Sequence, residues 1–257
     1  MVDVTPVPAF SSNYIWVLHR AQTAVAVDPG DAAPLLDYLA GAGLVLDAVL
    51  ITHHHADHVG GLPALQARFP ALTVCGPAGV AGVTHPLADG DRVELAPLGL
   101  SLDVLAVPGH TLDHLAYAGA GWLFCGDTLF AAGCGRLFEG TPAQMLASLT
   151  RLAALPDDTR IACAHEYTLD NLRFALAVEP DNPALHARLR RDQASRDAGL
   201  PTLPSTLAQE RDTNPFLRVR VPSVQAAAAR QTGEPATDDG LATFTTLRRW
   251  KDRFQAG

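Results

Sequence analysis

Apolar residues in the first two thirds of the chain occur in short runs rather than at helical spacing. The runs are rich in β-branched and aromatic residues, and Gly, Pro or Asp bounds most of them, which is the pattern of strands separated by turns. The pattern predicts strands at Val4–Val7, Tyr14–Leu18, Ala24–Val27, Ala48–Thr52, Leu72–Cys75, Arg92–Leu95, Leu100–Val107, Leu115–Ala118, Trp122–Cys125 and Arg160–Ala164.

Three helices are expected between these strands. Pro34–Ala42 is closed by a glycine, and Gly61–Phe69 ends before a proline. Pro142–Leu155 has Thr141 as its N-cap and a proline at its first helical position, where the missing backbone N–H carries no penalty.

The pattern changes after about residue 168, where β runs give way to segments rich in Ala, Leu, Arg, Asp and Gln. Pro and Gly separate the helices predicted there: Leu169–Val178, Pro183–Ala198, Ser205–Asp212, Ser223–Ala229 and Asp239–Phe254. We therefore expect a mixed α/β domain in residues 1–168. A helical appendage in residues 169–257 would pack on it rather than fold as an independent domain.

Composition narrows the class of protein. The chain has 257 residues, of which 48% are hydrophobic, so a sizeable core is available. The net charge of −8 argues against nucleic acid as a partner, because phosphate binding needs a broad basic surface. Four cysteines without C-x-x-C spacing are typical of reduced thiols. With no long apolar span and no secretory signal, we predict a cytoplasmic protein without a membrane partner and favour a monomer.

The strongest chemical signal is the sequence Thr-His-His-His-Ala-Asp-His at residues 52–58, which directly follows a predicted buried strand. His53 and His55 are two residues apart, so an extended segment points them to the same side and turns His54 away. Asp57 and His58 follow the turn and can face the other side of a shared centre. Imidazole and carboxylate are ligands of Zn²⁺ and similar divalent metals.

Three further ligand residues come at the ends of other predicted strands: His110, Asp127 and His165. These positions predict two metals. The first would be held by His53, His55 and His110, the second by Asp57, His58 and His165, and Asp127 would bridge them. Metals so held lie about 3.5–4 Å apart and share a hydroxide whose pKa is lowered to near neutrality. Zn²⁺ is the expected metal, and Fe or Mn also suits this ligand set.

Other residues of ligand type have simpler interpretations. The isolated His19, His85 and His186 are expected to be surface or hydrogen-bonded core residues. Cys125 and Cys134 fit no position in the two-metal count, so we expect buried thiols. Asp28 either supports a ligand or forms a plain turn.

The H-x-H-x-D-H pattern, with the later His, Asp and His, resembles the metallo-β-lactamase superfamily over about residues 2–168. That resemblance implies an α/β fold, an αββα sandwich with a binuclear site at one edge of its two sheets. Further motifs resemble the glyoxalase II family, also called hydroxyacylglutathione hydrolase. They are residues 52–61, Pro108–Thr111, Gly126–Phe130, Gly133–Thr141, Ala164–Thr168, Asn214–Arg218 and Arg248–Asp252.

The resemblance implies hydrolysis of S-D-lactoylglutathione to glutathione and D-lactate, the second step of methylglyoxal detoxification. A metal-bridging hydroxide would attack the thioester carbonyl, and Asp57 could accept its proton. The C-terminal helical region would help to bind glutathione, whose contacts would be Arg136, Tyr167, Arg248 and Lys251. Some family members carry Lys where this chain has Arg136 and Tyr where it has Phe138, so a phenolic hydroxyl is missing here.

The basic pair near the C-terminus agrees with this expectation. Arg248 and Lys251 are three residues apart and share a helical face, while Arg249 points elsewhere. Glutathione has two carboxylates, so a basic cluster is chemically required.

The main alternative is a persulfide dioxygenase, which resembles this chain in its metal motif and its use of a glutathione adduct but uses one iron. Such an enzyme is expected to lack the long helical C-terminal region, so the features after Leu169 favour the hydrolase. A flavodiiron protein would carry Glu in place of His55, a β-lactamase lacks the bridging Asp, and a tRNA-processing nuclease needs a basic exosite. Two open metal sites would be unusual in a non-catalytic metal-binding module.

Overall fold

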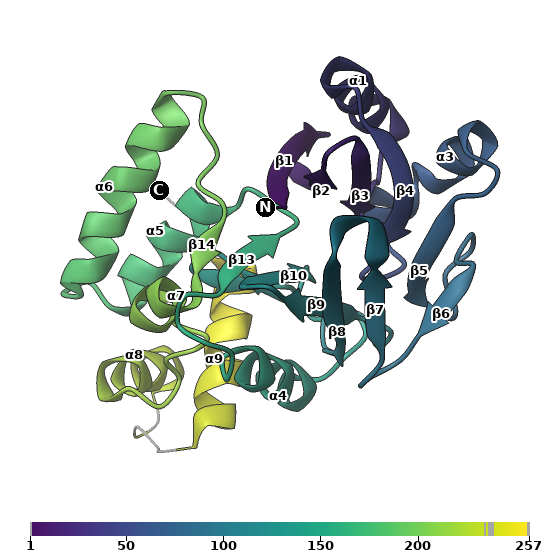
Figure 1. The fold of residues 1–257 in the computed structure, drawn as a ribbon. Coiled ribbons are helices and arrows are strands. Elements are labelled where there is room, and N and C mark those ends of the chain that lie inside the picture. The colour runs from purple at the N-terminus through teal and green to yellow at the C-terminus, as the bar shows by residue number, and fades with distance from the viewer. Residues whose placement is uncertain (1, 234, 236–238, 256–257) are drawn as a thin grey trace.

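The computed structural model describes residues 2–233, 235 and 239–255. Two six-stranded sheets face each other, and helices lie on the outer side of both, which makes the predicted αββα sandwich (Figure 1). The first sheet has the order β1 (Asp3–Ala9), β2 (Asn13–Arg20), β3 (Thr23–Val27), β4 (Val45–Leu50), β5 (Thr73–Pro77) and β6 (His85–Leu87).

The second sheet has the order β14 (Ser205–Thr206), β13 (Arg160–Cys163), β10 (Trp122–Gly126), β9 (Leu115–Gly119), β8 (Leu100–Ala106) and β7 (Arg92–Leu95). Between β10 and β13 in the chain lies a small antiparallel hairpin of β11 (Leu129–Phe130) and β12 (Gly133–Cys134). A 3₁₀ turn, η1 (Ala96–Leu98), joins β7 to β8.

The helices divide between the two outer faces. Apolar residues of α1 (Ala32–Ala42) and α3 (Leu62–Arg68) pack on the first sheet. The second sheet is covered by α4 (Pro142–Leu152) and by the C-terminal helices α5 (Thr168–Val178), α7 (Leu207–Thr213), α8 (Pro222–Thr232) and α9 (Gly240–Arg253) (Figure 1). The remaining helix of that region, α6 (Pro183–Asp197), packs on α5. None of the helices in the described residues is long and apolar enough to cross a membrane.

Two aromatic side chains fix the sheets against each other. Trp16 on β2 donates its indole N–H to the carbonyl of Cys163 on β13 at 2.9 Å. Tyr117 on β9 donates its hydroxyl to the carbonyl of Ile51, just after β4, at 2.5 Å. Both side chains are buried, so each brings its polar tip to a partner inside the core. These bonds set the ends of β4 and β13 at the same edge of the sandwich.

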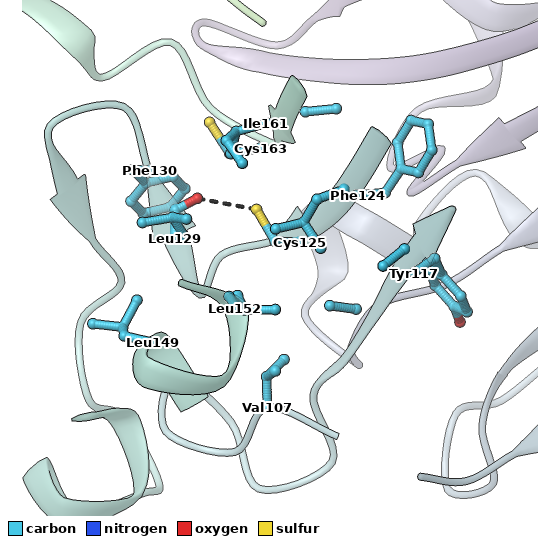
Figure 2. Packing of buried hydrophobic residues seen from close by; sticks show 14 of the residues in the cluster. Val107, Tyr117, Phe124, Cys125, Leu129, Phe130, Leu149, Leu152, Ile161 and Cys163 are labelled. Atoms are coloured by element: carbon cyan, nitrogen blue, oxygen red, sulfur yellow. Dashed lines mark hydrogen bonds between the residues drawn. The ribbon is translucent and has the colours of Figure 1, made fainter. Parts of the chain in front are cut away.

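The apolar core continues from between the sheets to the outer face of the second sheet. Figure 2 shows this side, where Leu149 and Leu152 of α4 lie near Cys125, Leu129 and the other labelled residues of the cluster. All four cysteines are free and buried, as expected for structural thiols.

Some predicted elements were wrong in detail. A short helix, α2 (Ala56–Val59), precedes α3, so the helical segment begins earlier than Gly61. The predicted helix Pro142–Leu155 ends at Leu152. Ser205–Thr206 pairs with β13 as the short strand β14. The Thr206 side chain accepts from the backbone N–H of Gln209 as the N-cap, so α7 begins only at Leu207. Strand structure therefore does not end at residue 168. The predicted domain division there stays a prediction.

Candidate metal centre

Seven side chains meet at the edge of the sandwich where loops leave β4, β8, β10 and β13. They are the residues predicted as metal ligands: His53, His55, Asp57, His58, His110, Asp127 and His165. Two groups among them bring their ligand atoms within 4.8 Å of one another: His53 with His55 and His110, and Asp57 with His58 and His165. The structure therefore gathers the residues into the two sets that the sequence predicted.

In the first set, two histidine nitrogens point at a third. His55 Nδ1 lies 3.1 Å from His53 Nε2 and 3.0 Å from His110 Nε2. His110 Nδ1 donates to the Arg136 carbonyl at 2.8 Å, so its neutral ring has a lone pair on Nε2.

The same reasoning applies to His53. Thr52 donates its hydroxyl to Asp28 and so accepts from His53 Nδ1, which leaves the lone pair of His53 on Nε2. His55 Nδ1 can carry only one hydrogen, but it faces the Nε2 lone pairs of both His53 and His110. A cation at this point would satisfy all three rings, so the residues fit a metal.

In the second set, Asp57 Oδ2 lies 3.5 Å from His58 Nε2 and 3.4 Å from His165 Nε2. His58 is 1% exposed, and its Nε2 has no hydrogen-bond partner. Asp127 Oδ1 is likewise buried without a partner. Unpaired buried polar atoms are costly, and two of them facing one point fit the ligand set of a metal ion.

Asp127 lies between the two sets. Its Oδ2 is 3.4 Å from Nε2 of His110 in the first set and 3.3 Å from Nε2 of His165 in the second. Its Oδ1 is 3.6 Å from His58 Nε2. One carboxylate thus reaches both sets, which is the position that the bridging role requires.

The electrostatics differ between the two sets. Burial lowers the pKa of His53, His55 and His110, so these rings are neutral at pH 7 and ready to coordinate. Burial acts in the same direction on His165, but hydrogen bonds to Asp127 and Asp57 outweigh it and raise its pKa to about 9.

The carboxylates of the centre are ionised. The hydrogen bond from His165 and the nearby charge of His58 hold the pKa of Asp57 well below its usual range. Burial raises the pKa of Asp127, but the charge of His58 and the hydrogen bond and charge of His165 override burial and lower it. A metal entering the second set would therefore displace protons from histidine.

Asp28 supports the centre rather than forming a plain turn. This buried carboxylate accepts from the backbone N–H of Thr52 at 2.7 Å and lies 3.0 Å from Nδ1 of His58. Such a carboxylate–histidine pair orients the ring and leaves Nε2 free for a metal. Its backbone has φ 52°, the left-handed region, where Asp is one of the better tolerated residues.

Three residues that support the candidate ligands were not predicted from the sequence. Ser12 Oγ lies 3.1 Å from His165 Nδ1, and Asn13 donates its amide to Asp57 Oδ2 at 3.0 Å. His114 stacks on His53, with ring centroids 4.6 Å apart, and its Nε2 accepts from the backbone N–H of Asp127 at 3.1 Å. Two features of the sequence could have indicated them: a polar turn before a buried strand, and a second histidine four residues after His110.

His54 points away from the centre, as the alternation predicts. Its Nδ1 lies 3.0 Å from Asp113, and its Nε2 lies 3.2 Å from Glu139. Its side chain is 42% exposed, in contrast to the buried His53. The three residues could together accept a cation, but their exposed imidazole and carboxylates already satisfy one another.

The predicted glutathione contacts gather around the β11–β12 hairpin. Tyr167 is 40% exposed, and its ring stacks on His165 with centroids 4.7 Å apart and planes 2° from parallel. Lys251 donates to the carbonyl of Asp170 at 3.1 Å. Its pKa is lowered to about 8, first by burial and then by the charge of Arg248. Phe138, 63% exposed, has its ring edge-on to those of His55 and His110.

The two arginines differ in exposure. The Arg136 side chain is 66% exposed, whereas Arg248 is buried and donates to the Cys134 carbonyl at 2.8 Å. Asp252 Oδ1 lies 2.9 Å from Arg248 Nη2 and 4.0 Å from Arg136 Nε. A carboxylate of the chain itself therefore lies between the two guanidinium groups. Arg249 is exposed, whereas Arg248 beside it is buried.

The fold and the histidine–aspartate cluster define the class. Residues 7–165 match the family model described as "Metallo-beta-lactamase superfamily", so the chain is a metallo-β-lactamase-fold protein with a divalent metal site. Residues 166–254 match the model described as "Hydroxyacylglutathione hydrolase C-terminus". The chain belongs to the hydroxyacylglutathione hydrolase family.

Full-length relatives support that membership. The hydroxyacylglutathione hydrolase of Photobacterium profundum is 55% identical, and the alignment covers 99% of this chain and all of the relative. The enzyme of the same name from Cupriavidus taiwanensis is 54% identical with the same coverage.

Solved structures share the fold. ETHE1 from Myxococcus xanthus is 25% identical with a TM-score of 0.65, over 98% of this chain and 90% of its own. TTHA1623 in a di-iron-bound form is 30% identical with a TM-score of 0.54, over 63% of this chain and 91% of its own.

Proposed function

We propose that this chain hydrolyses S-(2-hydroxyacyl)glutathione, with S-D-lactoylglutathione as its main substrate, to glutathione and D-lactate. The observation that carries the proposal is the pair of ligand sets sharing Asp127, next to a basic cluster at the β11–β12 hairpin. The names of the full-length relatives support the same reaction.

We propose two divalent metals per chain, with zinc expected and iron or manganese compatible with the ligands. His53, His55 and His110 would hold one metal, Asp57, His58 and His165 the other, and Asp127 both. Bound there, the metals supply an activated water and a Lewis acid for the thioester carbonyl. The di-iron-bound form of TTHA1623 shows that a related fold accommodates two metals.

The protein side chains would position the reactants. Asp57 is the more open of the two carboxylates, with 44% of its side chain exposed against 9% for Asp127. Because it is ionised and held by Asn13, its carboxylate can accept a hydrogen bond from the attacking water and orient it. The leaving thiolate needs little protonation, so the reaction requires no separate general acid.

The basic cluster would bind glutathione. Arg136, Arg248 and Lys251 lie around the hairpin, and Tyr167 stacks beside His165. The carboxylate of Asp252 lies between the two guanidinium groups, which supports carboxylate binding by this cluster, and glutathione has two carboxylates.

The test is hydrolysis of S-D-lactoylglutathione by the zinc-loaded protein. The reaction is monitored through the loss of thioester absorbance, and both products are assayed. We expect catalytic release of glutathione and D-lactate in equal amounts. A protein that binds metal but leaves the thioester intact, whether loaded with zinc, iron or manganese, would contradict the proposal. Oxygen consumption with glutathione persulfide by the iron-loaded sample would then favour the dioxygenase.

A further inference from the structure

The β11–β12 hairpin, residues 129–134, is held by side chains from the C-terminal region. Asn214 donates its amide to the carbonyls of Phe130, at 3.1 Å, and Gly133, at 2.9 Å. Asn171 on α5 donates to the Ala131 carbonyl at 3.0 Å. The remaining contacts join Ala132 N–H to Glu210 at 2.7 Å and Arg248 to the Cys134 carbonyl at 2.8 Å.

These four side chains form a buried cradle: Asn171, Glu210, Asn214 and Arg248, none more than 5% exposed. Glu210 is itself fixed by Arg188, whose guanidinium donates to it at 2.7 Å. Hydrogen bonds excluded from water in this way are costly to leave unmade, because a lost partner strands a buried polar group. The cradle therefore holds the hairpin backbone rigidly in one conformation.

The hairpin backbone packs closely against the cradle. Ala132 at its tip has φ 54°, a left-handed conformation that a residue with a side chain adopts only when its surroundings enforce it. A Cβ added at Gly133 would lie 2.5 Å from the amide nitrogen of Asn171, so the backbone is already in contact with the cradle. On the opposite side, the Cys125 thiol donates to the Leu129 carbonyl at 3.1 Å (Figure 2).

Both ends of the hairpin lead to the metal centre. Asp127, which lies between the two ligand sets, precedes β11 by two residues. Arg136, two residues after β12, accepts through its carbonyl the hydrogen bond that fixes the His110 ring. A Cβ at Gly135 would lie 2.0 Å from the Asp127 carbonyl, so the two ends of the segment are packed against each other.

We propose that Asn171, Glu210, Asn214 and Arg248 are positioning residues for the metal centre. By holding the hairpin, the cradle sets the place of Asp127 and the orientation of His110, one ligand between the sets and one within the first. The C-terminal region then determines metal retention and turnover as well as substrate binding. This inference rests on the metal assignment proposed above.

The experiment uses Asn171→Ala, which removes one hairpin bond, and Asn214→Ala, which removes two. Ser223→Ala is the matched control, because Ser223 lies in the same region and donates to Glu179 at 2.7 Å without contacting the hairpin. Each full-length protein is loaded with Zn²⁺, and metal release to a chromogenic chelator is timed below its unfolding temperature. The Co²⁺-loaded forms are compared by visible absorption.

We expect release to be faster by roughly fivefold in Asn171→Ala, in proportion to one lost hydrogen bond, and by about tenfold or more in Asn214→Ala. The Co²⁺ band should shift in both, and kcat should fall with little change in KM. Ser223→Ala should match the parent in all three. If Asn214→Ala does not fold, Asn171→Ala decides the question.

Folded variants that release zinc at the parent rate, with an unchanged Co²⁺ spectrum, would overturn the inference and leave the cradle a purely structural feature. A parent protein that fails to bind metal at all would instead contradict the proposed function, so the two failures are distinguishable.

Discussion

Asp28 Oδ2 accepts a hydrogen bond from Nδ1 of His58 across 3.0 Å, and both side chains are buried. The pair joins the end of β3 to α2 and leaves His58 Nε2 facing Asp57 and Asp127. Because the carboxylate fixes both the tautomer and the ring orientation, metal binding at the second set should depend on it.

Replacing that carboxylate by an amide tests the dependence. Asp28→Asn keeps the shape and suits the left-handed backbone, but it removes the charge that holds the His58 ring. We expect affinity for the second metal to fall by about 10- to 100-fold, as measured by chelator competition. Asp31→Asn is the control, because the Asp31 side chain caps α1 through an exposed hydrogen bond from the backbone of Ala33. Equal losses in both variants would contradict the supporting role of Asp28.

Neighbouring histidines in the metal loop should behave differently. His54→Ala removes only exposed contacts to Asp113 and Glu139, so we expect both metals to be retained and stability to change by about 0–1 kcal/mol. His55→Ala removes the ring on which His53 and His110 converge and should lose metal and most activity. Elemental analysis of the two variants checks this. Equal metal loss would show that the loop geometry is wrong.

Lys251 should make substrate binding depend on pH. Burial, then the charge of Arg248, lowers its pKa to about 8, so its ammonium is present below that pH and lost above it. The KM for S-D-lactoylglutathione should therefore rise above pH 8, by about ten- to a hundredfold when the charge-assisted bond is gone. The profile is measured between pH 7 and 9.5, after subtraction of spontaneous hydrolysis.

Two variants control the pH experiment. Lys251→Arg keeps its charge over the whole range and should flatten the profile. Arg249→Ala alters an exposed neighbour and should leave it unchanged. A KM that rises equally in the parent and in Lys251→Arg would assign the pH dependence to another group.

Phe138 lies beside the first ligand set with its ring largely exposed, and it has no hydroxyl to offer a ligand. Phe138→Tyr should add one polar contact to glutathione and lower KM by about two- to tenfold, with kcat nearly unchanged. Steady-state kinetics checks this. An unchanged KM would show that the substrate does not reach position 138.

The fold and the ligand sets could be predicted from sequence because their signals are local. Apolar runs mark the strands, and ligand residues directly follow them, so the convergence of His53, His110 and His165 follows from strands ending at one edge. Alternation along an extended segment was enough to separate His54 from His55.

The supporting contacts could not be predicted because they join distant segments through common residue types. Asn13 and Asp57 are 44 positions apart, and Asn214 reaches Phe130 across 84. A single Asn in the sequence does not reveal whether its amide donates to a distant buried segment or whether the residue simply forms a turn. Likewise, the spacing of Arg248 indicates a helical face but not that the face is buried against the hairpin.

The central claim, two metals acting together at a site bridged by Asp127, is tested most directly by adding Zn²⁺ stepwise to the metal-free protein. Hydrolysis of S-D-lactoylglutathione and bound zinc are measured on each sample. We predict that activity stays low at one equivalent and reaches its maximum at two per chain. Full activity at one equivalent, with no further zinc bound, would contradict the bridging role of Asp127 and the binuclear mechanism.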